Sequence, residues 1–439
     1  MKDFNWDEIK ERSLIDPKTV VSTAGNYESW KNLLPKSSNG FEIDWKSIEA
    51  AFPDWINSMK NCPQEPDYHL EGDVWTHTKM VMNALIENTD FQSLNETERE
   101  ILFFTALLHD VGKPYTSKRD EDNGRITSKG HSKRGSKESR IMLWFAGAPP
   151  YIRENIANLI THHQLPYTWE KNASIFELRE ISQSVNMKLL CNLSLADAMG
   201  RITRPVEEKI LIIDRVKLFK YACEDENCLN QPWTYNFSNP HAERLYWEGK
   251  GDVFEGRDVF WEKGSEVILL SGLPASGKDY WCELYGKDLP VLSLDTLREK
   301  MKIKNNSKAK GEAIQLMNEM ARELLRNNSP FIWNATHFST SMREKNINLL
   351  RQYGATVRIV HLESDYNTLV KRNNERGSTL PSSKIIDMAW KWEPALPTEA
   401  HEVIWWDEKP VYIPFITSKT SFKDEFDIKF NNVKQNFKL

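Results

Sequence analysis

The chain has 439 residues, of which 40% are hydrophobic, and its formal net charge is −5. This length predicts two or three domains, each with enough apolar residues for a core. The acidic balance argues against a protein that holds long duplex nucleic acid through a broad basic surface, although it allows a local basic groove for a strand end.

The cysteines and the N-terminus bear on the compartment. Five cysteines without a C-x-x-C pair predict free thiols in a reducing environment. The N-terminal stretch MKDFNWDEIK is charged, and no apolar run approaches the roughly 18 residues that a membrane span needs. We therefore expect a cytoplasmic protein with no membrane partner.

Residues 1–225 show helical periodicities and few β-branched runs, which predicts an all-α domain. We expect Asn95 to cap the third helix. The expected helices are Trp45–Ser58, Val74–Glu87, Glu96–His109, Ser136–Ala146, Tyr151–Thr161, Ser174–Ser182, Met187–Met199 and Pro205–Glu224.

The histidines of this half fall at predicted helix ends or on helix faces. Histidines with carboxylates and no thiolate suit a hydrolytic site for one or two Mn, Co, Ni, Fe or Zn ions, where a bound water is acidified and attacks an electrophile. Each histidine alone would be an ordinary core residue, but the set predicts a metal centre. Its members are His77, His109, Asp110, His131, His162, His163 and Asp197.

The order H, HD-x-x-K-P, H, HH and D, carried here by VWTHTKM, ALLHDVGKP, GHSKRGS, ITHHQLP and SLADAMGR, resembles the HD phosphohydrolase superfamily over about residues 65–201. The resemblance implies a catalytic role for Asp110 and two metal groups. The first would be His77, His109, Asp110 and Asp197, and the second His131 with His162 or His163.

Two cations follow the acidic ligands of this motif. Lys113 lies one helical turn past Asp110, and Arg201 lies four residues past Asp197 on the same helical face. Under the same resemblance, both could bind the substrate phosphate. The sequence leaves open which of His162 and His163 is a ligand, and whether His69 is a site residue or a turn histidine.

Residues 226–264 form a predicted connector, in which prolines and glycines interrupt aromatic residues such as Trp233, Tyr246 and Trp261. So many aromatics would not stay solvated in a flexible linker, so we expect this connector to pack. From residue 265 to 439 short apolar runs alternate with helical patterns, which predicts a P-loop domain with a parallel sheet covered on both faces and a C-terminal extension.

The expected fold class is therefore multidomain, α and α/β. The strands are expected at Val267–Ser271, Val291–Leu294, Phe331–Ala335, Val357–Leu362 and Val403–Trp406. The helices are expected to begin at Lys278 and to span about 312–326, 339–353, 365–374 and 383–392. In such sheets, ligands bind beyond the carboxyl ends of the strands.

The stretch EVILLSGLPASGKD, residues 266–279, combines a strand with the spacing Gly272-x4-Gly277-Lys278 of a P-loop. Backbone N–H groups and the following helix N-terminus would bind phosphate, and Lys278 could reach the β- and γ-phosphates of ATP or another NTP with Mg²⁺. Asp279 stands where the pattern has Ser or Thr on Mg²⁺. The expected nucleotide contacts are Gly272, Leu273, Pro274, Ala275, Ser276, Gly277, Lys278 and Asp279.

The phosphate acceptor requires further residues. Asp295 could accept a hydroxyl proton and Arg298 could hold a neighbouring phosphate; the alternative for Asp295 is a helix N-cap. Arg372 and Arg376 could form a lid over the donor phosphates or simply a solvated basic face. Asn334 and Thr336 could contact substrate or Mg²⁺, whereas His337 is not expected to.

The GLPASGKD loop, the D-x-x-R element and the lid arginines resemble the 5′-OH polynucleotide kinase branch of the P-loop phosphotransferases, over about residues 266–406. With the upstream motif, the chain resembles the bifunctional HD-domain and polynucleotide kinase fusions of bacterial RNA repair. This resemblance implies a phosphatase for 2′(3′)-phosphate or 2′,3′-cyclic phosphate ends. It also implies a kinase for 5′-OH ends of RNA or DNA, acting before a polynucleotide ligase.

Two alternatives stay open. The first is an HD nucleotidase fused to a kinase for a nucleoside or another small molecule. The second is an ATP-sensing switch, which the Asp295 and Arg298 pair disfavours because a switch needs no second substrate site.

Overall fold

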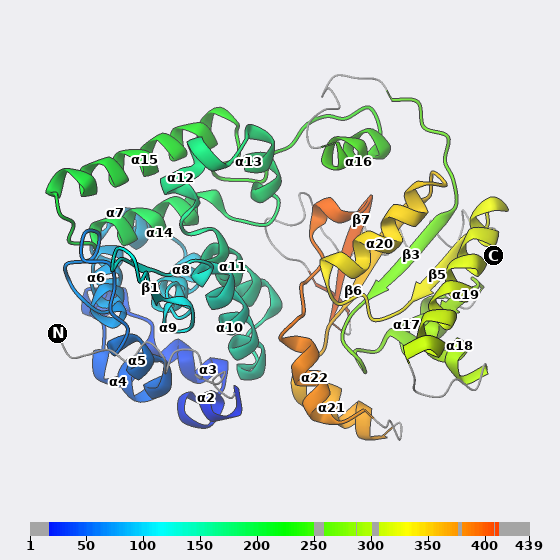
Figure 1. Ribbon diagram of the computed structural model, residues 1–439, viewed down its shortest axis with the longest axis horizontal. Coiled ribbons are helices and arrows are strands. Elements are labelled where there is room, and N and C mark those ends of the chain that lie inside the picture. Colours follow the sequence, from blue (N-terminus) through cyan, green and yellow to red (C-terminus); the bar gives the residue numbers. More distant parts are fainter. Residues whose placement is uncertain are drawn as a thin grey trace. The chain divides into compact units, whose positions relative to one another are not determined.

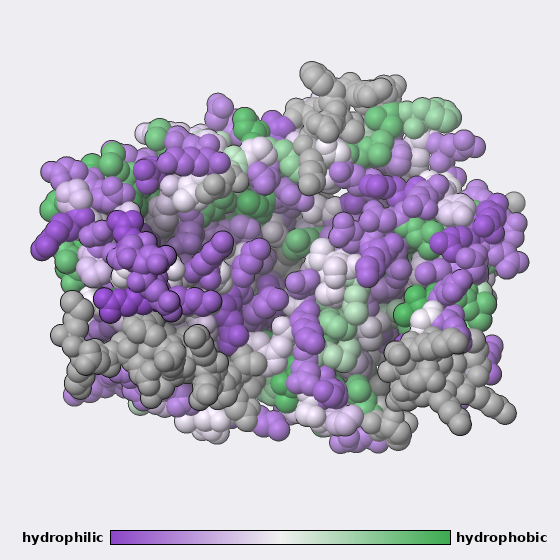
Figure 2. Space-filling view, in the orientation of Figure 1, coloured by the Kyte–Doolittle hydropathy of each residue, from purple (hydrophilic) through white to green (hydrophobic). Residues whose placement is uncertain are grey.

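The computed structural model describes residues 17–249, 259–286, 288–300, 307–375, 380–407 and 409–411. The chain divides into two compact units, Met1–Thr234 and Tyr235–Leu439 (Figure 1). Within the described ranges, no helix is both long and apolar enough to cross a membrane. On the face drawn in Figure 2, hydrophilic side chains predominate and apolar ones form scattered patches.

The first unit is helical, as expected, apart from the short antiparallel pair β1 (Lys118–Arg119) and β2 (Ile126–Thr127). Two 3₁₀ turns, η1 (Lys31–Leu33) and η2 (Ser37–Asn39), lie near its start. Its helices are α2 (Pro17–Ala24), α3 (Tyr27–Trp30), α4 (Trp45–Ala51), α5 (Pro53–Lys60), α6 (Val74–Glu87), α7 (Thr89–Ser93), α8 (Glu96–Leu108), α9 (Lys113–Thr116), α10 (His131–Ala146), α11 (Pro150–His162), α12 (Leu165–Asn172), α13 (Ile175–Ser182), α14 (Met187–Met199) and α15 (Val206–Asp225).

Helix α8 is the centre of this unit. Every residue from 100 to 108 is buried, and the helix packs against α6, α11 and α14. Asn95 caps it as predicted, in a capping box with Glu98. Because α8 ends at Leu108, the His109-Asp110 dipeptide emerges at the centre of the unit.

The prediction of a single helix over Trp45–Ser58 is wrong. The structure has α4 and α5 there, separated by Phe52 with φ −125° and ψ 52°. Pro53 explains the break, because proline has no N–H to donate and disfavours helical geometry at the residue before it.

The second unit holds a six-stranded sheet in the order β4-β5-β3-β6-β7-β8. The first five strands in this order are parallel, as predicted, and β8 adds an antiparallel edge that was not predicted. The strands are β3 (Glu266–Ser271), β4 (Val291–Ser293), β5 (Phe331–Asn334), β6 (Thr356–Leu362), β7 (Glu402–Asp407) and β8 (Lys409–Val411).

Helices cover both faces of this sheet, which confirms the predicted layers. On one face, Met317 of α19 and Leu350 of α20 pack with Leu269 and Trp333 of the strands. On the other face, Trp281 packs with Leu270 and other strand residues. The helices are α16 (Pro240–Glu248), α17 (Lys278–Tyr285), α18 (Leu294–Lys300), α19 (Ser307–Arg326), α20 (Thr340–Arg351), α21 (Tyr366–Glu375) and α22 (Ser382–Ala389), with the 3₁₀ turn η3 (Pro397–Glu399).

The register aligns the carboxyl ends of three strands. Asn334 pairs with Leu270 of β3 on one side and with Ser293 of β4 on the other. Residues just beyond these strands therefore share one edge of the sheet. The P-loop, Asp295 and Asn334 all come from this edge.

Candidate active sites

The first candidate site lies inside the helical unit, and among the described residues it contains three groups of side chains that could hold a metal ion, two of which consist entirely of predicted ligands. His77 of α6, His109 at the end of α8 and Asp197 of α14 form the first group, whose ligand atoms all lie within 4.8 Å of one another. All three residues are buried, and His77 Nε2 lies 3.0 Å from Asp197 Oδ1. Side chains from three different helices thus converge on one point.

Asp110, His131 and His163 form the second group, again with ligand atoms within 4.8 Å. Asp110 Oδ1 lies 3.3 Å from His131 Nε2, whereas Asp110 Oδ2 lies 3.2 Å from His109 Nε2. The two carboxylate oxygens therefore face different groups. This is the arrangement that lets one aspartate bridge two ions.

Gly112 allows the HD turn to approach α10 closely. A Cβ atom at this position would lie 2.2 Å from the backbone oxygen of His131 and 2.6 Å from the backbone nitrogen of Gly135. Both are backbone atoms, so they could not move aside at low cost. The glycine is what lets Asp110 sit against His131.

The structure places His163, and not His162, in the metal group. His163 is buried and its Nε2 lies 3.2 Å from that of His131, whereas His162 Nδ1 contacts the carbonyl oxygen of Asn158. Burial lowers the pKa of His163 to about 3 and that of His131 to about 4. Both are neutral at pH 7, as a metal ligand requires.

Hydrogen bonds fix which ring nitrogen faces the centre. The Nδ1 atoms of His109, His131 and His163 lie 2.7–2.8 Å from backbone carbonyl oxygens. A carbonyl only accepts, so Nδ1 carries the proton and Nε2 presents its lone pair. Among the described residues, His109 Nε2 and both oxygens of Asp110 are buried without a hydrogen bond of good geometry. These nitrogen and oxygen donors fit divalent transition metals.

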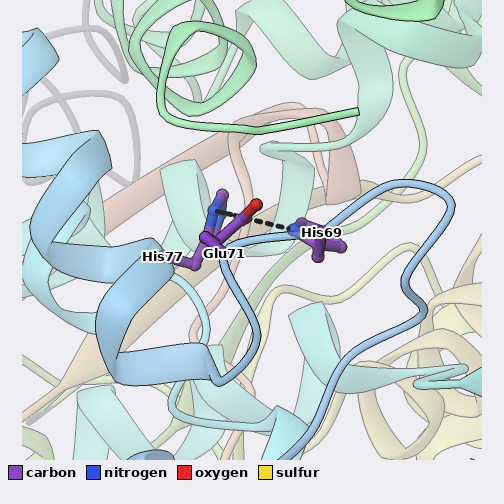
Figure 3. Close-up of side chains that lie close together, drawn as sticks. All are labelled: His69, Glu71 and His77. Atoms are coloured by element: carbon purple, nitrogen blue, oxygen red, sulfur yellow. Dashed lines mark hydrogen bonds and ion pairs between the residues drawn. The ribbon is translucent and has the colours of Figure 1, made fainter. Parts of the chain in front are cut away.

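Glu71 is a site residue that the sequence analysis missed. Its Oε1 accepts hydrogen bonds from Nδ1 of His77 and Nδ1 of His69, each at 2.8 Å, so it lies between the two histidines (Figure 3). Its Oε2 accepts from the backbone N–H of Ile202 at 3.0 Å. Although burial raises the pKa of Glu71, the imidazole donors hold it below its ordinary value. His69 is thus joined to the site through this carboxylate.

The two predicted phosphate-binding cations contact the ligand carboxylates. Lys113 Nζ lies 2.7 Å from Asp110 Oδ2 and donates to Gln64 Oε1 at 2.7 Å. Arg201 donates to both oxygens of Asp197, at 3.1 and 2.7 Å. Both cations therefore lie beside the predicted metal groups.

Tyr167 is a second residue that sequence reasoning missed. Its hydroxyl donates to Asp197 Oδ2 at 2.8 Å, and its ring lies 4.8 Å beneath the guanidinium of Arg201. Neither Tyr167 nor Gln64 belongs to the motifs, so no sequence signal marked them. Tyr167 thus contacts both a predicted metal ligand, Asp197, and a predicted phosphate-binding cation, Arg201.

The second candidate site is the P-loop between β3 and α17. Gly272 has φ +154°, and a Cβ there would lie 2.4 Å from the backbone oxygen of Leu362, so the turn requires glycine. Gly277 has φ +96° and precedes α17 directly. Lys278 donates to the carbonyl oxygens of Gly272 and Leu273 at 3.1 and 2.8 Å. The lysine thus folds over the loop that would receive phosphate.

A cavity of about 640 Å³ opens beside the loop. Its walls include Ser276 and Gly277, together with the aromatic rings of Tyr280 and Trp406. Arg372 also lines it and donates to Ser364 Oγ at 2.9 Å. The volume suits a nucleotide-sized ligand. Arg376, the other predicted lid arginine, lies outside the described residues.

Asp295 is in the first turn of α18 and its side chain is 92% exposed. Arg298, one turn later, lies 3.3 Å from its carboxylate. The alternative role of Asp295 as a helix N-cap is wrong, because Ser293 Oγ accepts from the N–H of Thr296 instead. The carboxylate is thus open to an acceptor.

Asn334, Thr336 and His337 lie at the carboxyl edge of the sheet, where each makes a hydrogen bond to a residue of β3, the P-loop or α17. Asn334 Nδ2 donates to Asp279 Oδ1 at 2.7 Å, and the carbonyl oxygen of Thr336 accepts from the N–H of Gly272. His337 is buried and its Nδ1 contacts the carbonyl oxygen of Leu270. His337 therefore contacts the backbone of the strand that leads into the P-loop, and it is not directed at a ligand.

Comparisons with known proteins divide the chain in the same way. Residues 74–209 match the HD domain family and residues 267–393 match an AAA domain family. The chain thus combines an HD hydrolase-type domain with a P-loop kinase-like domain.

Individual relatives match parts of the chain. The L-seryl-tRNA(Sec) kinase of Methanococcus maripaludis is 26% identical over 175 residues, which cover 38% of this chain and 64% of the relative. The CC-adding tRNA nucleotidyltransferase of Thermus thermophilus is 38% identical over 58 residues, 13% of each chain. A crystal structure of a putative kinase from Chloroflexus aurantiacus is 19% identical, with a TM-score of 0.30, and covers 40% of this chain and 97% of that one.

Proposed function

We propose that this protein is a bifunctional RNA end-healing enzyme. Its HD domain removes 2′(3′)-phosphate or 2′,3′-cyclic phosphate ends, and its P-loop domain transfers the γ-phosphate of an NTP to a 5′-OH end. The observation that supports the proposal is the presence, on one chain, of His and Asp groups that could hold metal ions and of a P-loop beside a nucleotide-sized cavity. Breakage of RNA that leaves these two ends needs both activities before a ligase can rejoin it.

In the HD site, His77, His109, Asp110 and Asp197 would hold one divalent metal, and Asp110 with His131 and His163 a second. Such metals acidify a bound water and polarise the phosphate. Lys113 and Arg201 supply positive charge to the phosphate oxygens, in addition to neutralising the ligand carboxylates that they contact.

In the kinase site, Lys278 would exchange its loop carbonyl contacts for the β- and γ-phosphates of the donor. Asp295 accepts the proton of the 5′-OH while that oxygen forms its bond to the γ-phosphorus. The bond from the γ-phosphorus to the bridging oxygen breaks, which leaves a nucleoside diphosphate and a 5′-phosphate end. Arg298 binds the phosphate next to the reacting hydroxyl.

The exposure of Asp295 favours a strand end over a small acceptor. A small molecule needs an enclosed pocket, whereas this carboxylate is 92% exposed in the described part of the chain. The tRNA relatives support RNA as the substrate class, since one phosphorylates seryl-tRNA(Sec) and another adds CC to tRNA.

Single substitutions separate the two activities. Lys278→Ala should lower transfer of γ-phosphate to a 5′-OH oligonucleotide by about 100-fold or more, because it removes charge stabilisation of the transferred group. Release of terminal phosphate should stay at the wild-type rate in this variant. Asp110→Ala should do the reverse. A wild-type protein that transfers no label, or a Lys278→Ala variant with full transfer, would remove the kinase half of the proposal.

A further inference from the structure

Asp279 is the one P-loop residue that departs from the usual pattern. In P-loop phosphotransferases, Mg²⁺ is held by a Ser or Thr hydroxyl after the loop lysine and by an aspartate from a nearby strand. This chain has Asp279 after Lys278, so the helix carries a carboxylate where a hydroxyl is usual. The residue at the strand position that usually supplies the metal-binding aspartate is therefore of interest.

The strand beside the P-loop ends in an amide. Asn334 is the last residue of β5, which pairs directly with β3 through Leu270 and Asn334. It is 7% exposed, and its Nδ2 donates to Asp279 Oδ1 at 2.7 Å. The two positions that normally share a metal are therefore in contact, but the carboxylate is on the helix and the strand position has an amide.

The hydrogen bond leaves one oxygen of each residue available. In the described part of the chain, neither Asp279 Oδ2 nor Asn334 Oδ1 makes a hydrogen bond. Carboxylate and amide oxygens are hard donors that suit Mg²⁺. The donor set at this edge therefore fits the ion that the kinase reaction requires.

The charge of the pair explains why Asp279 and Asn334 both differ from the usual residue types at their positions. The usual hydroxyl and aspartate carry one negative charge, and Asp279 with Asn334 carries the same charge. An aspartate at position 334 would put a second carboxylate about 2.7 Å from the first, and like charges so close cannot both stay ionised. The amide avoids this repulsion and donates a hydrogen bond that orients the carboxylate.

We infer that the metal-binding carboxylate of the nucleotide site is transposed from the strand to the helix. Asp279 supplies the anionic oxygen for the Mg²⁺ of the bound nucleotide, and Asn334 orients it and offers its amide oxygen. This inference rests on the proposed nucleotide-binding function of the P-loop, but not on the identity of the acceptor.

A double substitution that installs the usual residue types at both positions tests the inference. Binding of ADP is measured by calorimetry, with Mg²⁺ and with EDTA, and the ratio of the two affinities gives the metal enhancement. Asp279→Ser should lower this enhancement about tenfold or more, on the scale of losses seen when groups that support a metal site are removed. The double variant Asp279→Ser with Asn334→Asp should restore it to within a few-fold of wild type, because it recreates the usual arrangement.

Two controls keep the result interpretable. Asp279→Asn keeps the shape of the side chain and removes only its charge, so it should lose the enhancement with an unchanged fold. Glu283→Gln removes the same charge from an exposed position on the same helix and should change nothing.

The inference is overturned if Asp279→Ser retains the wild-type enhancement, or if the double variant is no better than Asp279→Ser. It is also overturned if ADP binds the wild-type protein equally well with Mg²⁺ and with EDTA. The readout needs no acceptor strand. If the variants show the predicted loss and recovery of the metal enhancement while the wild-type protein phosphorylates no 5′-OH end, the proposed kinase function is refuted and this inference stands.

Discussion

Replacing Glu71 with glutamine should weaken metal binding at the HD centre without disturbing the fold. The carboxylate accepts three hydrogen bonds, from His69, His77 and the backbone N–H of Ile202. It holds the Nδ1 proton of His77 and so keeps the Nε2 lone pair directed at Asp197 and the metal position. Glutamine has nearly the same shape but no charge, and its NH₂ group must face one of these donors.

Glu71 is not a predicted metal ligand itself but accepts a hydrogen bond from one, His77, and this sets the expected size of the effect. Loss of a carboxylate that supports a metal-ligating histidine costs about 10- to 100-fold in metal affinity, which is about 1.4–2.7 kcal/mol. Competition with a coloured chelator measures the affinity directly, and release of terminal phosphate gives the activity. Kinase activity of the same sample should not change.

A matched control is Glu87→Gln, an exposed carboxylate at the end of α6, the helix that carries His77. This variant should bind metal like the wild type. Wild-type metal affinity in Glu71→Gln would refute the reasoning. So would an equal loss in both variants, since it would point to a general charge effect rather than to the hydrogen bonds of Glu71.

Three further outcomes are expected. Gly112→Ala should destabilise the helical unit by about 1–3 kcal/mol in thermal unfolding and abolish phosphate release, because its Cβ would strike backbone atoms of α10; a fully active variant would contradict this. Tyr167→Phe should lower kcat/KM for phosphate release about tenfold while Arg201 is retained, because it removes a hydrogen bond to the charged Asp197; an unchanged value would exclude an orienting role. Glu154 is buried between Arg140 and Arg153, which hold its pKa below the ordinary value although burial raises it. The ionised Glu154 should therefore stabilise the fold above the ordinary carboxyl pKa, and this contribution should disappear as the pH falls through the lowered pKa of Glu154. The difference in unfolding free energy between wild type and Glu154→Gln should shrink in acid. A difference that stays constant with pH would refute the lowered pKa.

Local sequence signals were enough to predict most of the helices and strands. Helix α6 and helix α14 begin and end at the predicted residues, because apolar periodicity and capping residues act within a few positions of each other. The P-loop strand was also predictable, since a buried apolar run leads directly into glycines. These features need no knowledge of distant contacts.

Adjacent residues were harder to separate. His162 is the last residue of α11 and His163 is its C-cap, and successive residues of a helix point about 100° apart. The two histidines are the same residue type, and both come directly after the apolar periodicity of α11, so the sequence does not distinguish them. Only the packing of α11 against the other helices decides that His163 faces His131.

Contacts between distant segments were not available from the sequence. Glu71 lies six residues before His77 in a turn, and nothing local marks it as the partner of that ring. Asp279 and Asn334 are 55 residues apart, and their contact follows from β5 being the neighbour of β3 in the sheet. Strand order is set by the whole domain, so it could not be read from either segment.

The most direct test of the central claim is an end-group assay on one RNA that carries both a 5′-OH and a 2′,3′-cyclic phosphate, with ATP, Mg²⁺ and a varied transition metal. We expect the wild-type protein to convert both ends, Lys278→Ala to convert only the cyclic phosphate end, and Asp110→Ala to convert only the 5′-OH end. If both ends stay unchanged while free nucleotides are phosphorylated or dephosphorylated, the protein acts on small molecules and the end-healing proposal is wrong.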